Sequence, residues 1–260
     1  MPAPSSKPTS QLDILAIAAH RDDVEQTCGG TLLKMAQKGQ RTGILDLTRG
    51  EMGTRGTAAD REREANEAAR LMQACWREAL DIPDGRVENT WVNRLKIARV
   101  IRRTRPRVVI LPYWQGRHPD HYTCSTLGYE ACFLAGLKKL EIGAKLREQG
   151  VQVEVDDALP PHRPFKIIYA TLYYDVRPTF VVDISDQFEA RFAALMAYKS
   201  QFEDQQEGSG LFPARADIHD RIHSMARFYG MMTGVKYAEP FLQKEVGLVE
   251  DLTAIPVQSI

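Results

Sequence analysis

The chain has 260 residues, enough for one sizeable hydrophobic core, and nothing in its composition divides it into two domains. Its 34 basic and 34 acidic side chains give a formal net charge of zero, which does not favour a nucleic-acid or polyanion binder and indicates a small partner. No stretch approaches the roughly 20 apolar residues of a membrane-spanning helix, so we expect no membrane partner.

Four cysteines, at positions 28, 75, 124 and 132, form no CxxC pair. This spacing argues against a zinc ribbon and a disulfide framework, and it favours a reducing, cytoplasmic environment. Residues 1–11 hold three prolines and three serines and lack the apolar run of a secretory signal. We therefore expect a disordered tail over 1–11 and one folded domain over 12–260.

The first half of the chain alternates between strand and helix patterns. Residues 12–19 (LDILAIAA) form a nearly continuous apolar run that is typical of a strand buried on both faces. A helix over 23–38 and a second buried strand over 42–48 follow. Residues 49–59 carry three glycines and have no periodicity, which predicts a loop at the carboxyl end of the second strand.

The same alternation continues to the end of the chain. We expect helices over 60–79, 89–104, 121–140 and 216–233, another helix capped by Ser185, and strands over 107–113, 165–174 and 179–184. Residues 141–163 mix charge, glycine and proline, which indicates an excursion from the core. Taken together, the elements predict an α/β fold, with a Rossmann-like, mostly parallel sheet and helices on both faces.

Two polar segments fall where predicted strands end, and ligand sites gather there in open α/β sheets. The segment AAHRDDVEQTCGGT, 18–31, supplies His20 and Asp23, and WQGRHPDH, 114–121, supplies His121. Two imidazoles and one carboxylate are the ligand count of a catalytic zinc site with an open fourth position. Iron and manganese accept the same ligands, so the metal itself stays open.

The neighbouring residues suggest a hydrolytic mechanism. If Asp23 binds the metal, Asp22 points elsewhere and is placed to take a proton, as general base, from metal-bound water. The resulting hydroxide would attack an amide carbonyl. His118, held as imidazolium by Asp120, would stabilise the oxyanion or protonate the departing amine. Either motif alone also fits a helix cap or a surface turn, and only their joint placement favours catalysis.

The motifs AHRDDVEQTCGGT and HPDH, with LTRGEMGTRGT between them and YKSQF at 198–202, resemble those of the LmbE-like, or PIG-L-like, family of zinc-dependent N-acetylglucosaminide deacetylases. The resemblance covers about residues 12–245 and is greatest to the bacillithiol biosynthesis deacetylases. It implies zinc held by His20, Asp23 and His121, with Asp22 as base and a His118–Asp120 pair. It further implies deacetylation of N-acetylglucosaminyl malate and a homo-oligomer such as a hexamer.

The resemblance also makes Glu51 and Arg55 candidates for substrate contact, with a salt bridge or a solvated loop as the alternative. Position 21 departs from the family pattern AHPDD, because Arg21 stands where the family has proline. Arg21 either faces solvent or reaches an anionic substituent such as malate. Tyr198 either enters the site or packs in the core, and Glu25 fits a helix-start carboxylate or an orienting residue better than a ligand.

Three other functions stay open. The first is a deacetylase or amidase of another N-acetylglucosaminyl compound, such as a thiol conjugate or a chito-oligosaccharide. The second is a sugar-binding protein that kept the fold without turnover. The third is a nucleotide binder, which the absence of GxGxxG and GxxxxGK[ST] from the sequence disfavours.

Overall fold

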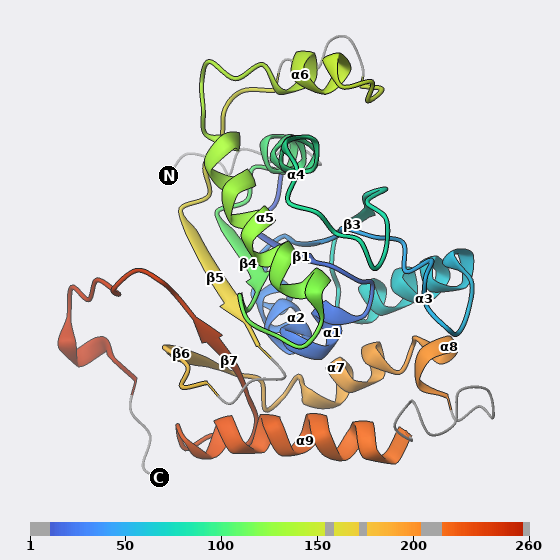
Figure 1. The fold of residues 1–260 in the computed structure, drawn as a ribbon. Coiled ribbons are helices and arrows are strands. Elements are labelled where there is room, and N and C mark those ends of the chain that lie inside the picture. Colours follow the sequence, from blue (N-terminus) through green and yellow to red (C-terminus); the bar gives the residue numbers. More distant parts are fainter. Residues whose placement is uncertain (1–10, 154–158, 172–175, 204–214, 257–260) are drawn as a thin grey trace.

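The structure is a computed structural model that describes residues 11–153, 159–171, 176–203 and 215–256. The predicted disordered tail lies, except for its last residue, outside these ranges. Within them, a single sheet of seven strands forms the centre of the molecule (Figure 1). The strands are β1 (Ile14–Ala18), β2 (Thr42–Asp46), β3 (Trp76–Ala79), β4 (Val108–Pro112), β5 (Lys166–Ala170), β6 (Phe180–Asp183) and β7 (Ala238–Leu242).

The strands lie in the order β3-β2-β1-β4-β5-β7-β6. β7 pairs antiparallel with β5 and β6, and the other pairings are parallel. In β1, Leu15 pairs with Gly43 on one side and Val109 on the other, so this strand lies in the interior of the sheet. The mostly parallel α/β sheet predicted from the sequence is confirmed.

Helices cover both faces of the sheet, as the alternating pattern predicted. Side chains alternate across each strand, so in β1 Leu15 and Ile17 contribute to one core while Ala16 and Ala18 contribute to the other. The helices are α1 (Asp23–Thr27), α2 (Gly29–Gln37), α3 (Ala58–Leu71), α4 (Trp91–Thr104), α5 (Pro119–Ala135), α6 (Ile142–Glu148), α7 (Phe188–Leu195), α8 (Lys199–Phe202) and α9 (Arg215–Met231).

The two faces carry different helix sets. Helices α4, α5 and α6 pack on one face, and α1, α2, α3 and α7 pack on the other (Figure 1). A smaller core joins α7 to α9 near β6. Among the described helices, none combines the length and the apolar character that crossing a bilayer requires.

The predicted helix over 60–79 is wrong in its second half. Helix α3 begins at Ala58, where Thr57 and Asp60 form a reciprocal capping box, and ends at Leu71. Gln73 takes a positive φ of 55°, which ends the helix. The following residues, Trp76–Ala79, pair with β2 as the edge strand β3. Tertiary pairing thus overrides the apparent helical stripe that continued through this segment.

Three further expectations need correction. The helix predicted over 23–38 is interrupted at Cys28, because the buried Glu239 carboxylate accepts hydrogen bonds from the backbone N–H groups of Gly30 and Thr31 and starts a new helix there. The excursion over 141–163 contains helix α6, whose Ile142 and Leu146 join the core under α4. The final segment contains β7, which the sequence did not reveal.

Candidate active site at the strand ends

Two loops meet at the carboxyl ends of β1 and β4. The first follows β1 and carries His20, and the second follows β4 and leads into α5, whose first turn carries His121. These strands are neighbours where the strand order reverses, and in open α/β sheets such a point leaves a crevice that holds ligands. The structure therefore brings together the two polar segments that the sequence singled out.

His20, Asp23 and His121 form one cluster. Nδ1 of His20 lies 3.2 Å from Nε2 of His121 and 3.4 Å from Oδ2 of Asp23. Nε2 of His121 lies 3.2 Å from Oδ1 of Asp23. A tetrahedral zinc ion bound at about 2.0–2.2 Å would separate its ligand atoms by about 3.3–3.6 Å. The donor types and their spacing therefore fit a divalent cation of this kind.

The cluster favours positive charge. Burial disfavours a charged His20, but the carboxylates of Asp23 and Asp120 outweigh that effect and raise the pKa of His20 to about 12. Burial likewise opposes ionisation of Asp23, yet the imidazoles of His121 and His20 hold the pKa of Asp23 well below its usual value. A proton or a metal ion can supply the positive charge that these carboxylates stabilise.

The second nitrogen of His20 faces two carboxylates. Its Nε2 lies 3.1 Å from Oδ1 of Asp84 and 3.4 Å from Oδ2 of Asp120. Asp120 is fixed in turn, because its carboxylate accepts backbone hydrogen bonds from Gly85 at 2.8 Å and Val87 at 3.2 Å. Such carboxylates orient a histidine ring and fix its tautomer, which leaves Nδ1 of His20 directed at the cluster.

The expected ion pair between His118 and Asp120 is not formed. His118 is the N-cap of α5, and its Nδ1 accepts the backbone N–H of Asp120 at 3.2 Å, while the Asp120 carboxylate turns to His20. Burial, together with the neighbouring imidazoles of His20 and His121, lowers the pKa of His118 despite the attraction of Asp120. The surroundings of His118 thus favour a neutral imidazole, not the imidazolium expected from the sequence.

Asp22 lies beside this cluster in an ion pair. Its Oδ1 lies 3.1 Å from Nη2 of Arg61, a largely buried residue of α3, and Nε2 of Gln26 donates to its Oδ2 at 3.4 Å. Asp22 is close enough to His121 for its charge to help raise the pKa of that histidine. The guanidinium therefore orients the carboxylate that the sequence assigned as general base.

Glu51 and Arg55 lie in the loop between β2 and α3. The Glu51 carboxylate accepts hydrogen bonds from the backbone N–H of Arg49 at 3.2 Å and of Asp84 at 2.8 Å, so it supports the turn that carries Asp84. Arg55 is buried, and its carbonyl accepts a hydrogen bond from Gln201 at 2.7 Å. Both residues are built into the loop, and contact with a substrate remains a prediction for each.

Sequence reasoning missed Asp84. It lies in the segment IPDGR just beyond β3, and the erroneous helix over 60–79 hid the fact that a strand ends there. If the sequence had predicted the short strand β3, Asp84 would have been a candidate site residue, because it follows the end of a strand as Asp23 and Asp120 do. One nitrogen of His20 and one oxygen each of Asp84 and Asp120 lie within 4.8 Å of one another, as do nitrogens of His20, His118 and His121.

A second cluster of charged side chains centres on Arg77 of β3. The Arg77 guanidinium contacts both oxygens of Asp46, at 2.8 and 3.0 Å, and Oε1 of Glu25 at 2.6 Å. Its Nη2 also donates to the carbonyl of Arg21 at 2.5 Å. Burial raises the pKa of Glu25 to about 7, because it outweighs the attraction of Arg77. We call Arg77, Asp46, Glu25 and Tyr198 the Arg77 network.

Tyr198 and Arg21 resolve two alternatives left open by the sequence. Tyr198 is fully buried, and its hydroxyl donates to Oε1 of Glu25 at 3.0 Å and contacts the carbonyl of Arg21, so it packs in the core. The Arg21 side chain is 5% exposed and its Nη1 donates to the carbonyl of Ala58 at 3.0 Å. Arg21 therefore does not face solvent, and its charge interacts with the carboxylates of Asp46 and Glu62 within the chain.

The three remaining histidines, His162, His219 and His223, lie away from the cluster. A ring nitrogen of His162 contacts the carbonyl of Pro106 at 2.7 Å, and His223 contacts the Tyr237 hydroxyl at 3.0 Å. His219 lies next to Asp220 on an exposed stretch of α9.

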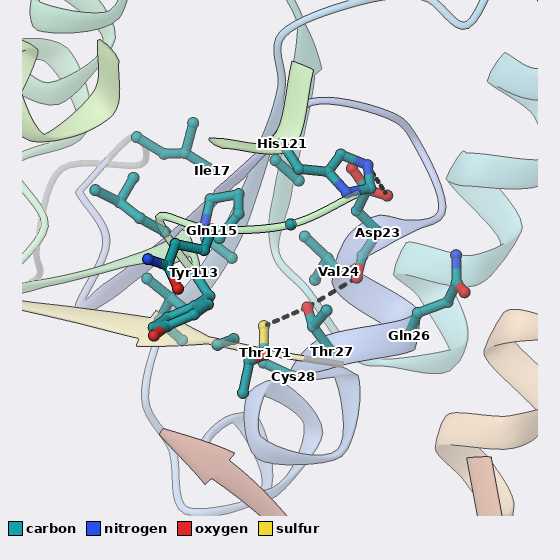
Figure 2. Close-up of a pocket in the computed structure, with 17 residues that line it drawn as sticks. Ile17, Asp23, Val24, Gln26, Thr27, Cys28, Tyr113, Gln115, His121 and Thr171 are labelled. Carbon is teal, nitrogen blue, oxygen red and sulfur yellow. Dashed lines mark hydrogen bonds and ion pairs between the residues drawn. The ribbon is translucent and has the colours of Figure 1, made fainter. Parts of the chain in front are cut away.

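A pocket opens beside Asp23 and His121 (Figure 2). Residues at the carboxyl ends of β1, β4 and β5 form one side of its wall, and the first residues of α1 form another. Its lining is mainly apolar and includes Val24, Ile110 and Ala170. The pocket therefore offers a small apolar space directly against two of the three clustered side chains.

Comparison with known proteins places this geometry in context. The family model described as PIG-L: GlcNAc-PI de-N-acetylase matches residues 15–132, which include the two strand-end motifs. A diacetylchitobiose deacetylase from Thermococcus kodakarensis is 32% identical over 241 residues, covering 87% of this chain and 80% of that protein.

Solved structures show the same fold. The conserved protein TT1542 from Thermus thermophilus is 38% identical, with a TM-score of 0.77 and coverage of 92% of this chain and 98% of that one. The N,N'-diacetylchitobiose deacetylase from Pyrococcus horikoshii is 26% identical, with a TM-score of 0.72 and coverage of 91% and 85%.

Proposed function

The chain belongs to the PIG-L family, and we propose that it is a metal-dependent hydrolase that removes the acetyl group from an N-acetylglucosaminide. One observation carries this proposal: the side chains of His20, Asp23 and His121 approach one another pairwise at 3.2–3.4 Å through ring nitrogens and the two Asp23 carboxylate oxygens, with the Asp22 carboxylate beside them. Sugar binding without turnover would not require such a donor set.

We assign His20, Asp23 and His121 as the ligands of a divalent metal, which would be zinc, with iron or manganese as alternatives. When bound, the metal would supply Lewis acidity, which polarises a carbonyl and lowers the pKa of water. Asp84 and Asp120 would hold His20 in the tautomer that presents Nδ1.

The chain's own residues would then handle the protons. Asp22, oriented by Arg61, would accept a proton from the attacking water. His118 accepts a hydrogen bond at Nδ1, so in its neutral form it carries its proton on Nε2. From Nε2 it would donate a hydrogen bond to the developing oxyanion, which replaces the imidazolium role expected from the sequence. The proton that Asp22 takes from the water would pass to the departing amine.

The pocket beside Asp23 and His121 supports a small acyl group. A methyl group placed there would contact Val24, Ile110 and Ala170, while the polar amide stays at the cluster. We therefore propose that acetyl is preferred to longer acyl groups. An N-acetyl, N-propanoyl and N-butanoyl series on one amino sugar tests this, and equal kcat/KM across the series would contradict it.

For the remainder of the substrate we place N,N'-diacetylchitobiose before N-acetylglucosaminyl malate. The relative that is 32% identical carries the name diacetylchitobiose deacetylase. The malate conjugate of bacillithiol biosynthesis is less favoured, because Arg21, the residue that could have paired with malate, is buried against Ala58. The four cysteines are unpaired and three are buried, which supports the reducing cell interior as its location.

The decisive experiment measures amine release by the chelator-stripped protein after addition of zinc, iron(II) or manganese. We expect about one metal per chain, release from one of the two sugars, and a loss of about 10²–10⁴-fold in kcat for Asp22→Asn with metal content unchanged. Asp81→Asn is the matched control, because Asp81 pairs with Lys96 at the surface. No release from either sugar with any metal would refute the proposal.

A further inference from the structure

The segment around helix α8 has no part in the proposed chemistry so far. Residues 198–202, YKSQF, contain α8 and lie beside α3 (Figure 1). Ser200 donates from its backbone N–H and its hydroxyl to the two carboxylate oxygens of Glu64, each at 2.7 Å. Nε2 of Gln201 donates to the carbonyl of Arg55 at 2.7 Å. The segment therefore joins α3 to the end of the loop that precedes it, residues 49–57, which we call the glycine loop.

The glycine loop also packs closely against α8. Gly56 has a φ of +70°, which favours glycine, and a Cβ at this position would lie 2.7 Å from Cβ and Oγ of Ser200. The loop contains three glycines, so its backbone has much freedom to lose and its position depends on such contacts. Hydrogen bonds and close packing thus fix the same end of the loop.

The glycine loop supports the assigned base. A Cβ at Gly50 would lie 3.2 Å from Cζ of Arg61, and one at Gly53 would lie 3.4 Å from its Nη1, so the loop backbone packs directly on the guanidinium. Nη2 of the same guanidinium lies 3.1 Å from Oδ1 of Asp22. The loop therefore holds in place the group that orients Asp22.

The same loop supports the turn that contacts His20. The backbone N–H of Met52 donates to Oδ2 of Asp84 at 3.0 Å, and the carboxylate of Glu51 accepts the backbone N–H of Asp84 at 2.8 Å. Oδ1 of Asp84 lies 3.1 Å from Nε2 of His20. The glycine loop is thus a common support for the base and for one of the assigned metal ligands.

These contacts connect α8 to the reacting centre in two steps. We propose that Ser200 and Gln201 are positioning residues: they hold the glycine loop, which holds Arg61 against Asp22 and Asp84 against His20. This inference rests on the proposed function, because it assigns the base and the metal ligands as given there. The acyl pocket is lined by residues outside the glycine loop, so the effect should fall on kcat more than on KM.

Gln201→Met tests whether α8 holds the loop, because it keeps the length of the side chain and removes the amide donor. Trypsin should cleave after Arg55, which is buried in wild type, faster in the variant than in wild type. Gln201→Glu keeps the shape but replaces the donor by an acceptor, so it should act in the same direction. Cleavage does not require turnover, so this readout is independent of the proposed function.

Kinetics and metal binding test the positioning role. With metal bound, kcat of Gln201→Met should fall by about 10–100-fold with KM within about threefold of wild type, because a small misplacement of a base is costly. Metal affinity should fall by up to about 10-fold, because Asp84 loses support for His20. A contact that only stabilised the fold would lower the melting temperature and leave kcat of the folded enzyme unchanged.

Gln187→Met is the matched control. Nε2 of Gln187 donates to Oε1 of Gln37 at 2.9 Å and joins α7 to α2, so its loss removes an equivalent amide contact and should leave cleavage, kcat and metal affinity unchanged. Unchanged cleavage in both Gln201 variants would overturn the role of α8 in holding the loop. Faster cleavage with unchanged kcat and metal affinity would overturn the positioning role. Absence of amine release from wild type would instead refute the proposed function, and the positioning role with it.

Discussion

Two groups of charged residues share the segment 20–25, and they differ in how their negative charge is balanced. In the first, the Asp23 carboxylate is paired with the imidazoles of His20 and His121, whose charge depends on bound protons. In the second, Asp46 and Glu25 surround the guanidinium of Arg77. The first group can exchange its protons for a metal ion, whereas the second already contains a permanent cation.

The comparison shows that residue types alone do not make a cluster of titratable residues a metal or catalytic site. Its exposure and its counter-charges also matter. The Arg77 network is buried and supports the loop through the carbonyl of Arg21. The His20 cluster is partly exposed and adjoins a pocket. We therefore expect substitutions in the first group to affect metal content and turnover, and substitutions in the Arg77 network to affect stability.

The sharpest test of this division is His121→Ala. Loss of one ligand should remove the metal and cost several kcal/mol of transition-state stabilisation, a fall in kcat/KM of about 10³-fold or more. Metal analysis and amine release measure both effects. The matched control is His219→Ala, at a histidine outside the cluster, and normal metal content in His121→Ala would contradict the ligand assignment.

Arg77→Met should show the opposite pattern. It leaves Asp46 and Glu25 buried without their cation, and breaking a buried pair in this way costs about 3–5 kcal/mol of stability. Denaturant unfolding measures this loss, and metal stoichiometry should persist in the folded protein. Arg77→Lys keeps the charge without the planar fork and should fall between wild type and Arg77→Met. A fully stable Arg77→Met protein would break the comparison.

Asp120→Asn tests a carboxylate that supports the first group. This carboxylate lies 3.4 Å from Nε2 of His20, so its loss should weaken metal binding by about 10–100-fold without abolishing it. Metal titration with a competing chelator measures the affinity. Asp84→Asn should act in the same direction but less, because Asp84 is more exposed. An unchanged metal affinity in both variants would show that Asp84 and Asp120 do not support the metal ligands.

The smallest expected effect is that of Tyr198→Phe. It removes a hydrogen bond to Glu25, worth about 0.5–1.5 kcal/mol net, and leaves the packed ring in place. Unfolding experiments should detect the loss, while kcat should stay within a few-fold of wild type. A large fall in kcat with normal stability would instead place Tyr198 in the reaction.

Much of the fold was predictable because its signals are local. The apolar run before His20 and the one before Tyr113 identified two central strands, and the polar residues that follow them fell at the predicted edge. The metal-ligand candidates lie in those loops or in the first turns of the helices that follow, so their encounter follows from parallel strands sharing one carboxyl edge. The sequence alone could not place the edge strand β3, whose residues also continue a helical stripe.

The sequence by itself determined the α/β architecture and the three side chains that cluster at its strand ends. Both follow from local sequence, because the spacing of apolar residues identifies each strand and the next few residues identify where it ends. The tertiary structure alone decided which carboxylates serve that cluster. The Asp120 carboxylate contacts His20 and not His118, and Asp84 contacts His20 from the segment after β3, a strand that the sequence did not predict. The guanidinium of Arg77 neutralises the charges of Asp46 and Glu25. Such charge pairing joins segments far apart in the chain, so no local pattern records it.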